Sequence, residues 1–166
     1  MLYVCQMKKS CFIFLFLITG ITLKIQAQSE KLIQSENSPY QNAIGIKVWD
    51  GLGISYKHFF TEKGAIEAIA FFSGHGFRSS GLYEFHFPIS AEPGLRWFVG
   101  PGLHLGAYDK SHGDGLYFGI DGILGMEYNF QKIPLNLSID WQPAVEFGND
   151  RGFMGSWGGL AARYIF

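Results

Sequence analysis

The sequence predicts an all-β protein, an eight-stranded antiparallel up-and-down transmembrane β-barrel. Apolar and polar side chains alternate along eight segments, the polar face of these segments is rich in glycine, and the last residue, Phe166, is aromatic. Alternation with a period of two indicates strands, because successive side chains of a strand point to opposite faces. Charged residues are only 16% of the chain, against about 25% in soluble domains. No apolar run reaches the roughly 18 residues of a membrane-spanning helix.

The N-terminus has the three parts of a secretory signal peptide. Lys8 and Lys9 precede an apolar run at residues 11–23, and Ala27 is a small residue at the expected cleavage site. A basic start, a short apolar run and a small residue before the cut are typical of such signals. We therefore predict a signal peptide at residues 1–27.

Cleavage changes the composition of the mature chain. Both cysteines and three lysines leave with the signal peptide, so 10 basic and 14 acidic residues remain, a net charge of −4. A chain without thiols excludes disulfides and zinc–thiolate sites, and mild acidity without a basic patch gives no support for nucleic-acid binding. We expect residues 28–42 to form a periplasmic tail and residues 43–166 the outer-membrane barrel domain. The start, Met1 or Met7, and the exact cleavage position stay open.

Eight alternating segments are separated by turn-forming connections. The clearest segment, 135–147, carries Leu137 and Ile139 on one face and polar residues on the other. The predicted strands are 43–49, 52–60, 65–73, 82–88, 95–108, 116–130, 135–147 and 157–166. Short connections at 61–64 and 131–134 alternate with longer ones at 74–81, 109–115 and 148–156, and only the hairpin at 49–51 is shorter than expected. Short periplasmic turns and longer external loops are typical of outer-membrane barrels.

Periodicity alone does not show which face is inside, since a soluble, lipocalin-like barrel would bury the apolar face. Glycine on the polar face favours the membrane orientation, because a narrow eight-stranded lumen has little room for large side chains. These glycines are Gly45, Gly53, Gly100, Gly102, Gly106, Gly119 and Gly125. Aromatic residues near strand ends, such as Trp49 and Trp97, fit the girdles of a membrane barrel. The ending with Tyr164 and Phe166 resembles the signal that outer-membrane barrels present to the barrel-assembly machinery.

In this orientation ten charged residues line the lumen. They are Lys47, Lys57, Glu67, Glu84, Arg96, Asp121, Glu127, Asp140, Glu146 and Arg163. Because both signs are present, we expect a packed network of ion pairs and hydrogen bonds, with a proton or ion path as the alternative. An eight-stranded barrel filled by side chains leaves no open channel. Pro101 and Pro143 each remove a ladder donor, so a bulge or a local weakness is expected at both.

The mature chain resembles the small outer-membrane β-barrel proteins of Bacteroidetes. The stretches that carry this resemblance are GLGISYKHFFTEKGAIEA at 51–68 and EPGLRWFVGPGLHLGAY at 92–108. In architecture the chain is also similar to OmpA-type and OmpX-type barrels. The resemblance implies the cell outer membrane as location, and its motifs identify the type of barrel and not an activity.

Two functions from different classes remain. The first is a non-enzymatic barrel with a structural role, or a surface-interaction role in which its loops contact an extracellular ligand that the sequence leaves open. The alternative is a lipid A-modifying enzyme of the deacylase or acyltransferase type, which needs a histidine with a serine or an acid near the outer rim. Residues of these types near the loops are Ser73, His75, Ser79, Ser80, Asp109, Ser111, His112 and Asp114.

The spacing of these residues is not diagnostic of a catalytic site. Asp109, His112 and Asp114 also have the chemistry of metal ligands, but flexible loops rarely preorganise such a site. We therefore assign no catalytic residues, no metal site and no cofactor from the sequence. The predicted partners are outer-membrane lipid and, through the C-terminal strand, the barrel-assembly machinery.

Overall fold

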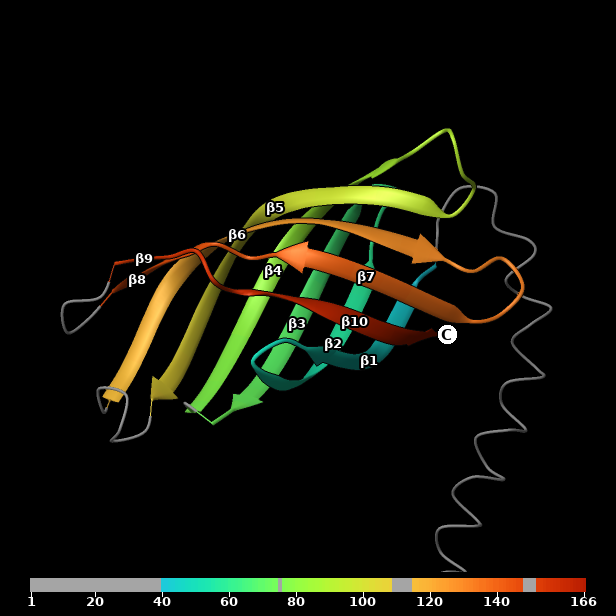
Figure 1. The fold of residues 1–166 in the computed structure, drawn as a ribbon. Helices are drawn as coiled ribbons and strands as arrows, with labels where there is room; N and C mark the ends of the chain where they lie inside the picture. The colour runs from blue at the N-terminus through green and yellow to red at the C-terminus, as the bar shows by residue number, and fades with distance from the viewer. Residues whose placement is uncertain (1–39, 75, 109–114, 148–151) are drawn as a thin grey trace, which may run out of the picture. The chain divides into compact units, whose positions relative to one another are not determined.

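A computed structural model describes residues 40–74, 76–108, 115–147 and 152–166 (Figure 1). The predicted signal peptide and most of the predicted tail lie outside these residues. Ten strand segments are present in the described part of the chain. They are β1 Asn42–Val48, β2 Gly51–Phe59, β3 Gly64–Ser73, β4 Gly76–Pro88, β5 Leu95–Tyr108, β6 Gly115–Asn129, β7 Leu135–Trp141, β8 Ala144–Phe147, β9 Phe153–Met154 and β10 Gly158–Ile165. No helix long and apolar enough to cross a membrane occurs among these residues.

The segments form one antiparallel sheet that closes on itself. Each strand from β1 to β6 pairs with the next, and β1 also pairs with β10. The segments β7 and β8 follow each other along β6, and β9 and β10 follow each other along β8 and β7. Ten segments therefore build eight wall strands, which confirms the predicted eight-stranded antiparallel barrel.

The burial pattern of β6 shows which face is inside. Buried and accessible residues alternate from Tyr117 to Asn129, with Asp121 2% exposed and Phe118 62% exposed. The same inversion holds around the barrel, because most exposed large side chains on the strands are apolar and most buried charged ones point inward. A soluble barrel would bury the apolar face, so this wall is suited to an apolar surrounding.

The barrel has two ends, which we call the turn end and the loop end. The turn end holds Tyr40, the C-terminus and the connections 60–63, 89–94 and 130–134. At this end Tyr40, Ala43, Phe59, Ala65 and Ile165 form a buried apolar cluster. Tyr40, which lies inside the stretch that the sequence predicted as a tail, is therefore packed into this end of the barrel.

The predicted connection at 74–81 is wrong for most of its length, because β4 begins at Gly76. Glycine and serine in this stretch resemble a loop, yet its residues pair with β3 on one side and β5 on the other. Arg78 and Ser80 alternate inward and are buried. Tertiary pairing has overridden the local turn preference, as is common for strands.

Both prolines singled out by the sequence interrupt a ladder without shifting it. Pairing between β4 and β5 lapses next to Pro101, and the register resumes unchanged on either side of the gap. At Pro143 the strand divides into β7 and β8, and both keep the same register along β6. The predicted local weakness is present at each proline, and the predicted bulge is present at neither.

A bulge occurs instead in the strand that faces Pro143. Trp141 pairs with Gly158 and Ala144 pairs with Met154. Three residues on the β9–β10 side thus face two on the β7–β8 side, which is the arrangement of a β-bulge. Of the three, Gly155 and Ser156 supply backbone carbonyl oxygens to the outer wall of the barrel.

Candidate functional site

Lys57 is the centre of a buried ionic cluster near the turn end. We call this cluster the turn-end network; it contains Lys57, Glu67, Glu84, His86, Glu127 and Arg163. The Lys57 Nζ atom lies 2.7 Å from a Glu84 carboxylate oxygen, 3.4 Å from Glu67 and 3.5 Å from Glu127. All these side chains are fully buried or nearly so, which makes each charge dependent on its partners.

Arg163 connects this network to three wall strands. Its guanidinium pairs with the Glu67 carboxylate. The same group donates hydrogen bonds to the Ser55 hydroxyl at 2.6 Å, the Asn136 side-chain oxygen at 3.0 Å and the Ser138 hydroxyl at 2.8 Å. Each of its three nitrogens therefore has a partner, and Arg163 is 0% exposed.

Tyr40, two residues before the start of β1, covers the turn-end network. Its hydroxyl donates to a Glu127 oxygen at 3.2 Å, and its ring meets the edge of Phe59 with centroids 4.8 Å apart. Burial, and then the nearby Glu127 carboxylate, raise the pKa of the Tyr40 hydroxyl well above its usual range. Tyr40 therefore remains a neutral donor at physiological pH and closes the apolar cluster at this end.

A second ionic cluster, the loop-end network, lies nearer the opposite end. It contains Arg78, His104, Asp121 and Glu146. The Arg78 guanidinium pairs with Asp121 and lies 3.4 Å from Glu146, and His104 Nδ1 lies 3.0 Å from Asp121. A separate pair, Lys47 and Asp140, has its charged atoms 2.7 Å apart.

An apolar layer contacts both networks. It consists of Ile69, Phe71, Leu82, Phe98 and Ile123, with Trp157 packed against them. The Phe98 ring faces Lys57 Nζ, 4.4 Å from the ring centroid, and the Trp157 ring faces the Arg78 guanidinium at the same distance. Such cation–aromatic contacts are stabilising when water is excluded. The layer thus has one charged cluster on each side.

Glycines on neighbouring strands make room for this layer. Four of its side chains stand directly across from a glycine: Phe71 from Gly53, Leu82 from Gly102, Phe98 from Gly125 and Ile123 from Gly100. A Cβ at Gly125 would lie 2.4 Å from the Phe98 ring, and one at Gly53 would lie 2.7 Å from the Phe71 ring. The glycines on the inner face therefore serve small-to-large packing across the strands.

Replacing Gly53 by alanine tests this packing. We expect the variant to lose about 1–3 kcal/mol of unfolding free energy, because the new methyl overpacks the Phe71 ring. In a cycle with Phe71→Ala, the double variant should cost less than the sum of the single ones, by about 0.5–3 kcal/mol. Gly81→Ala is the control, since a Cβ there meets nothing within 4 Å. Strict additivity of the cycle in chemical unfolding would contradict the packing argument.

Nine of the ten predicted lumen residues are buried in the two networks or in the Lys47–Asp140 pair. Arg96 is the exception. It is only half-buried, and it donates to the Glu62 backbone oxygen at 3.0 Å in a turn-end connection. Alternation assigns Arg96 to the inner face, but its place next to the start of β5 lets the side chain reach the connection instead. Of the predicted assembly signal, Tyr164 and Phe166 stack with ring centroids 6.4 Å apart.

Sequence reasoning left one arginine and two histidines of the lumen off the candidate list. Arg78 was missed because its segment was predicted to be a connection. His86 and His104 lie on the polar faces of predicted strands, so the alternation itself could have found them. His86 contacts carboxylate oxygens of Glu84 at 2.8 Å and Glu127 at 3.3 Å.

Among the candidate catalytic residues, Ser80 lies in the lumen. Its hydroxyl accepts from the side chains of Arg78 and Gln142, each at 3.4 Å. Ser79 alternates to the outer side of β4 and Ser73 ends β3. The other candidates, namely His75, Asp109, Ser111, His112 and Asp114, lie outside the described residues.

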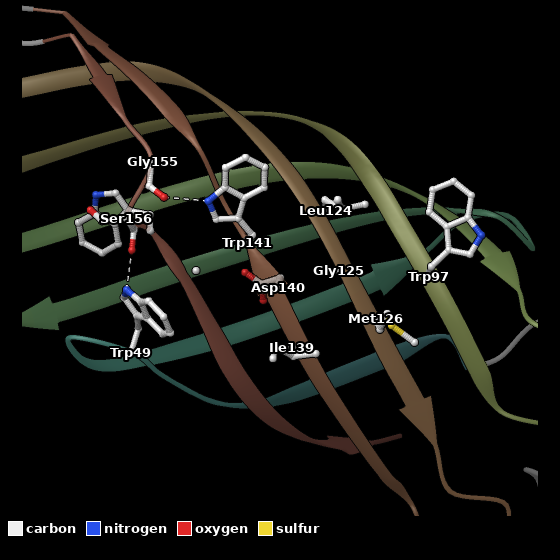
Figure 2. A pocket seen from close by; sticks show the side chains of 12 residues that line it. Trp49, Trp97, Leu124, Gly125, Met126, Ile139, Asp140, Trp141, Gly155 and Ser156 are labelled. Carbon is white, nitrogen blue, oxygen red and sulfur yellow. Dashed lines mark hydrogen bonds between the residues drawn. The ribbon is translucent and has the colours of Figure 1, made fainter.

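The outer wall carries a groove, which Figure 2 shows from close by. Its floor is made by Leu124, Met126 and Ile139 on β6 and β7, and Trp97 on β5 borders it on one side. Trp49 and Trp141 border it on the other side, next to the bulge. We call this feature the outer groove; its cavity volume is about 770 Å³.

The two tryptophans beside the bulge are hydrogen-bonded to its backbone. The Trp49 indole N–H donates to the Ser156 oxygen at 2.7 Å, and the Trp141 indole N–H donates to the Gly155 oxygen at 2.8 Å (Figure 2). The extra residue of the bulge leaves carbonyls without ladder partners. The indoles therefore satisfy these carbonyls and are themselves fixed in place.

A closed antiparallel barrel with a charged interior and an apolar outer wall defines the class: the fold is that of an OmpA-like outer-membrane β-barrel. A comparison with solved structures supports this. The chain is similar to the N-terminal β-barrel domain of Pseudomonas aeruginosa OprF, with a TM-score of 0.54 and 21% sequence identity over 75% of this chain and 95% of that one. No family model and no curated protein matches the sequence.

Proposed function

We propose that this chain is a non-enzymatic outer-membrane β-barrel with a closed polar lumen, and that its role is structural or consists of surface interactions through its loops. The observation that carries the proposal is the distribution of side chains in the barrel wall, which is the reverse of that in a soluble barrel. Apolar side chains are exposed along the strands, whereas charged residues are buried and paired inside. The likeness to the OprF barrel domain supports the same class of protein.

A membrane is the surrounding that this wall fits. Within a bilayer each backbone polar group needs a partner, and a closed barrel supplies one without leaving sheet edges. The predicted signal peptide at 1–27 favours export, and the predicted assembly signal at Tyr164 and Phe166 favours assembly in the outer membrane. The turn end, with the shorter connections, would then face the periplasm and the loop end the exterior.

The packing inside the barrel supports a closed lumen. The apolar layer lies between the turn-end and loop-end networks, and its Phe98 and Leu82 are almost completely buried. A barrel of eight strands is just wide enough for side chains to fill its interior. Steady ion conduction would require these side chains to move out of the path.

Cell fractionation tests the location. We expect the chain in the outer membrane, with a migration on gels that changes on heating because the folded barrel resists the detergent. Recovery in the soluble periplasm, without heat-dependent migration, would refute the membrane assignment.

Conductance measurements test the closed lumen. In planar bilayers the purified barrel should produce no steady conductance, and stable pores would refute the closed lumen.

Mass spectrometry of lipid A tests the non-enzymatic part. A deletion strain should have the same lipid A acyl pattern as its parent. An altered pattern that the intact gene restores would favour the alternative, a lipid A-modifying enzyme. Because location and acyl pattern are measured separately, the membrane assignment can stand while the non-enzymatic role fails.

A further inference from the structure

We propose that the outer groove is a binding site for an acyl chain of a membrane phospholipid. The inference rests on the proposed membrane location, because the groove would be filled by the surrounding bilayer. It goes further by assigning one defined place on the wall where a chain is retained. The cavity volume of about 770 Å³ falls within the roughly 300–1,000 Å³ of small-molecule sites.

The floor of the outer groove is hydrocarbon. Leu124, Met126 and Ile139 are 48%, 43% and 57% exposed, so about half of each side chain is available to a ligand. Methionine is unbranched and adapts to irregular apolar shapes. A flexible chain of methylene groups has matching chemistry, because it makes van der Waals contacts with this floor and neither surface needs a hydrogen bond.

The two backbone oxygens of the bulge at the edge of the groove already have hydrogen-bond donors. The Gly155 and Ser156 oxygens accept from Trp141 and Trp49, which leaves the indole rings as apolar side walls. In hydrocarbon an unsatisfied carbonyl is costly, so these bonds make the edge suitable for a lipid environment. They also hold both rings, and a preformed wall lowers the entropy lost on binding.

The lining favours a phospholipid over other occupants. Strand addition by a peptide needs unpaired backbone, whereas the floor residues on β6 and β7 pair with each other. Among the described residues that line the groove, none is a lysine or an arginine. A lipid A phosphate would need such cations nearby, so a zwitterionic phospholipid is the better match.

Native mass spectrometry of the detergent-purified full chain tests the site, with phosphatidylethanolamine carrying 16-carbon chains as the probe. We expect one lipid to stay bound to the wild type. Met126→Trp fills the floor and should weaken retention about tenfold or more, which corresponds to about 1.4 kcal/mol. Leu103→Trp is the matched control, because it adds the same indole to another exposed position of the wall and should retain lipid as the wild type does.

The outcomes separate this inference from the proposed function. Equal lipid retention by Met126→Trp and the wild type would refute the site and leave a barrel with only general lipid contact. Stronger retention of lipid A than of phosphatidylethanolamine would refute the choice of lipid. Heat-dependent migration of both tryptophan variants shows that they fold as barrels. A chain that does not insert into vesicles at all would refute the proposed function itself.

Discussion

Replacing Arg163 by methionine is expected to lower the unfolding free energy of the barrel by about 3–5 kcal/mol, because it breaks a buried ion pair from one side. The variant leaves the Glu67 carboxylate without its guanidinium partner. It also removes donors to Ser55 on β2 and to Asn136 and Ser138 on β7, all three of which are buried. Urea unfolding in phospholipid vesicles, followed by tryptophan fluorescence, measures the loss.

Arg96 provides the matched control for Arg163. Both arginines occupy positions that the alternation assigns to the inner face. Arg96, however, is only half-buried and donates a hydrogen bond to a backbone oxygen at the turn end. Arg96→Met should therefore cost about 0–1 kcal/mol. Adding Glu67→Gln to Arg163→Met should recover part of the loss, since it removes the buried charge that has lost its guanidinium partner. Equal costs for the two arginine variants would contradict the role given to the turn-end network.

Replacing Phe98 by alanine is the second large expected effect. The side chain is 0% exposed, stacks on His86 with centroids 5.0 Å apart and covers Lys57. Removing a buried phenyl ring leaves a cavity and costs about 3–5 kcal/mol. The same unfolding assay applies, with the unfolding midpoint as the readout.

Phe118 offers a control with the same chemistry on the other face. Phe118 lies on the outer wall of β6 and is 62% exposed, so its removal creates no internal cavity. Phe118→Ala should cost about 1–2 kcal/mol, because it loses only the transfer of the exposed ring from water into lipid. If Phe118→Ala were as damaging as Phe98→Ala, the outer wall would be the packed core, and the proposed orientation would be wrong.

The strands and the orientation of their faces could be predicted from the sequence because both follow from local rules. A period of two identifies a strand without any tertiary information. Long segments such as 116–130 repeat the pattern often enough to be unambiguous, and β6 occupies Gly115–Asn129. The small residues on the polar face then indicated that this face lines a narrow lumen and does not face solvent.

The limits of the prediction have tertiary causes. The start of β4 was missed because Gly76, Ser79 and Ser80 suit a loop equally well until β3 and β5 pair with them. Arg78, which lies in this stretch, was lost from the candidate network for the same reason. The partner of each charge also depends on which strands face each other across the lumen, and no local pattern contains that information.

The outer groove was beyond sequence reasoning for a related reason. It depends on a single extra residue between Met154 and Gly158, and the periodicity of the sequence does not predict this residue. Trp49 and Trp141 were visible only as aromatic residues near strand ends. Their hydrogen bonds to the bulge bring together positions more than ten residues apart.

Tryptophan quenching in vesicles tests the central claim, that the apolar face meets lipid and the charged face meets the lumen. Single-tryptophan variants, with phenylalanine at the other tryptophan positions, are inserted into vesicles whose phospholipids carry brominated acyl chains. Trp97 and Trp141 are exposed on the outer wall, whereas Trp157 packs against the apolar layer inside. We predict strong quenching of Trp97 and Trp141 and little of Trp157. Quenching of Trp157 as strong as theirs, or none of Trp97 and Trp141, would contradict the account.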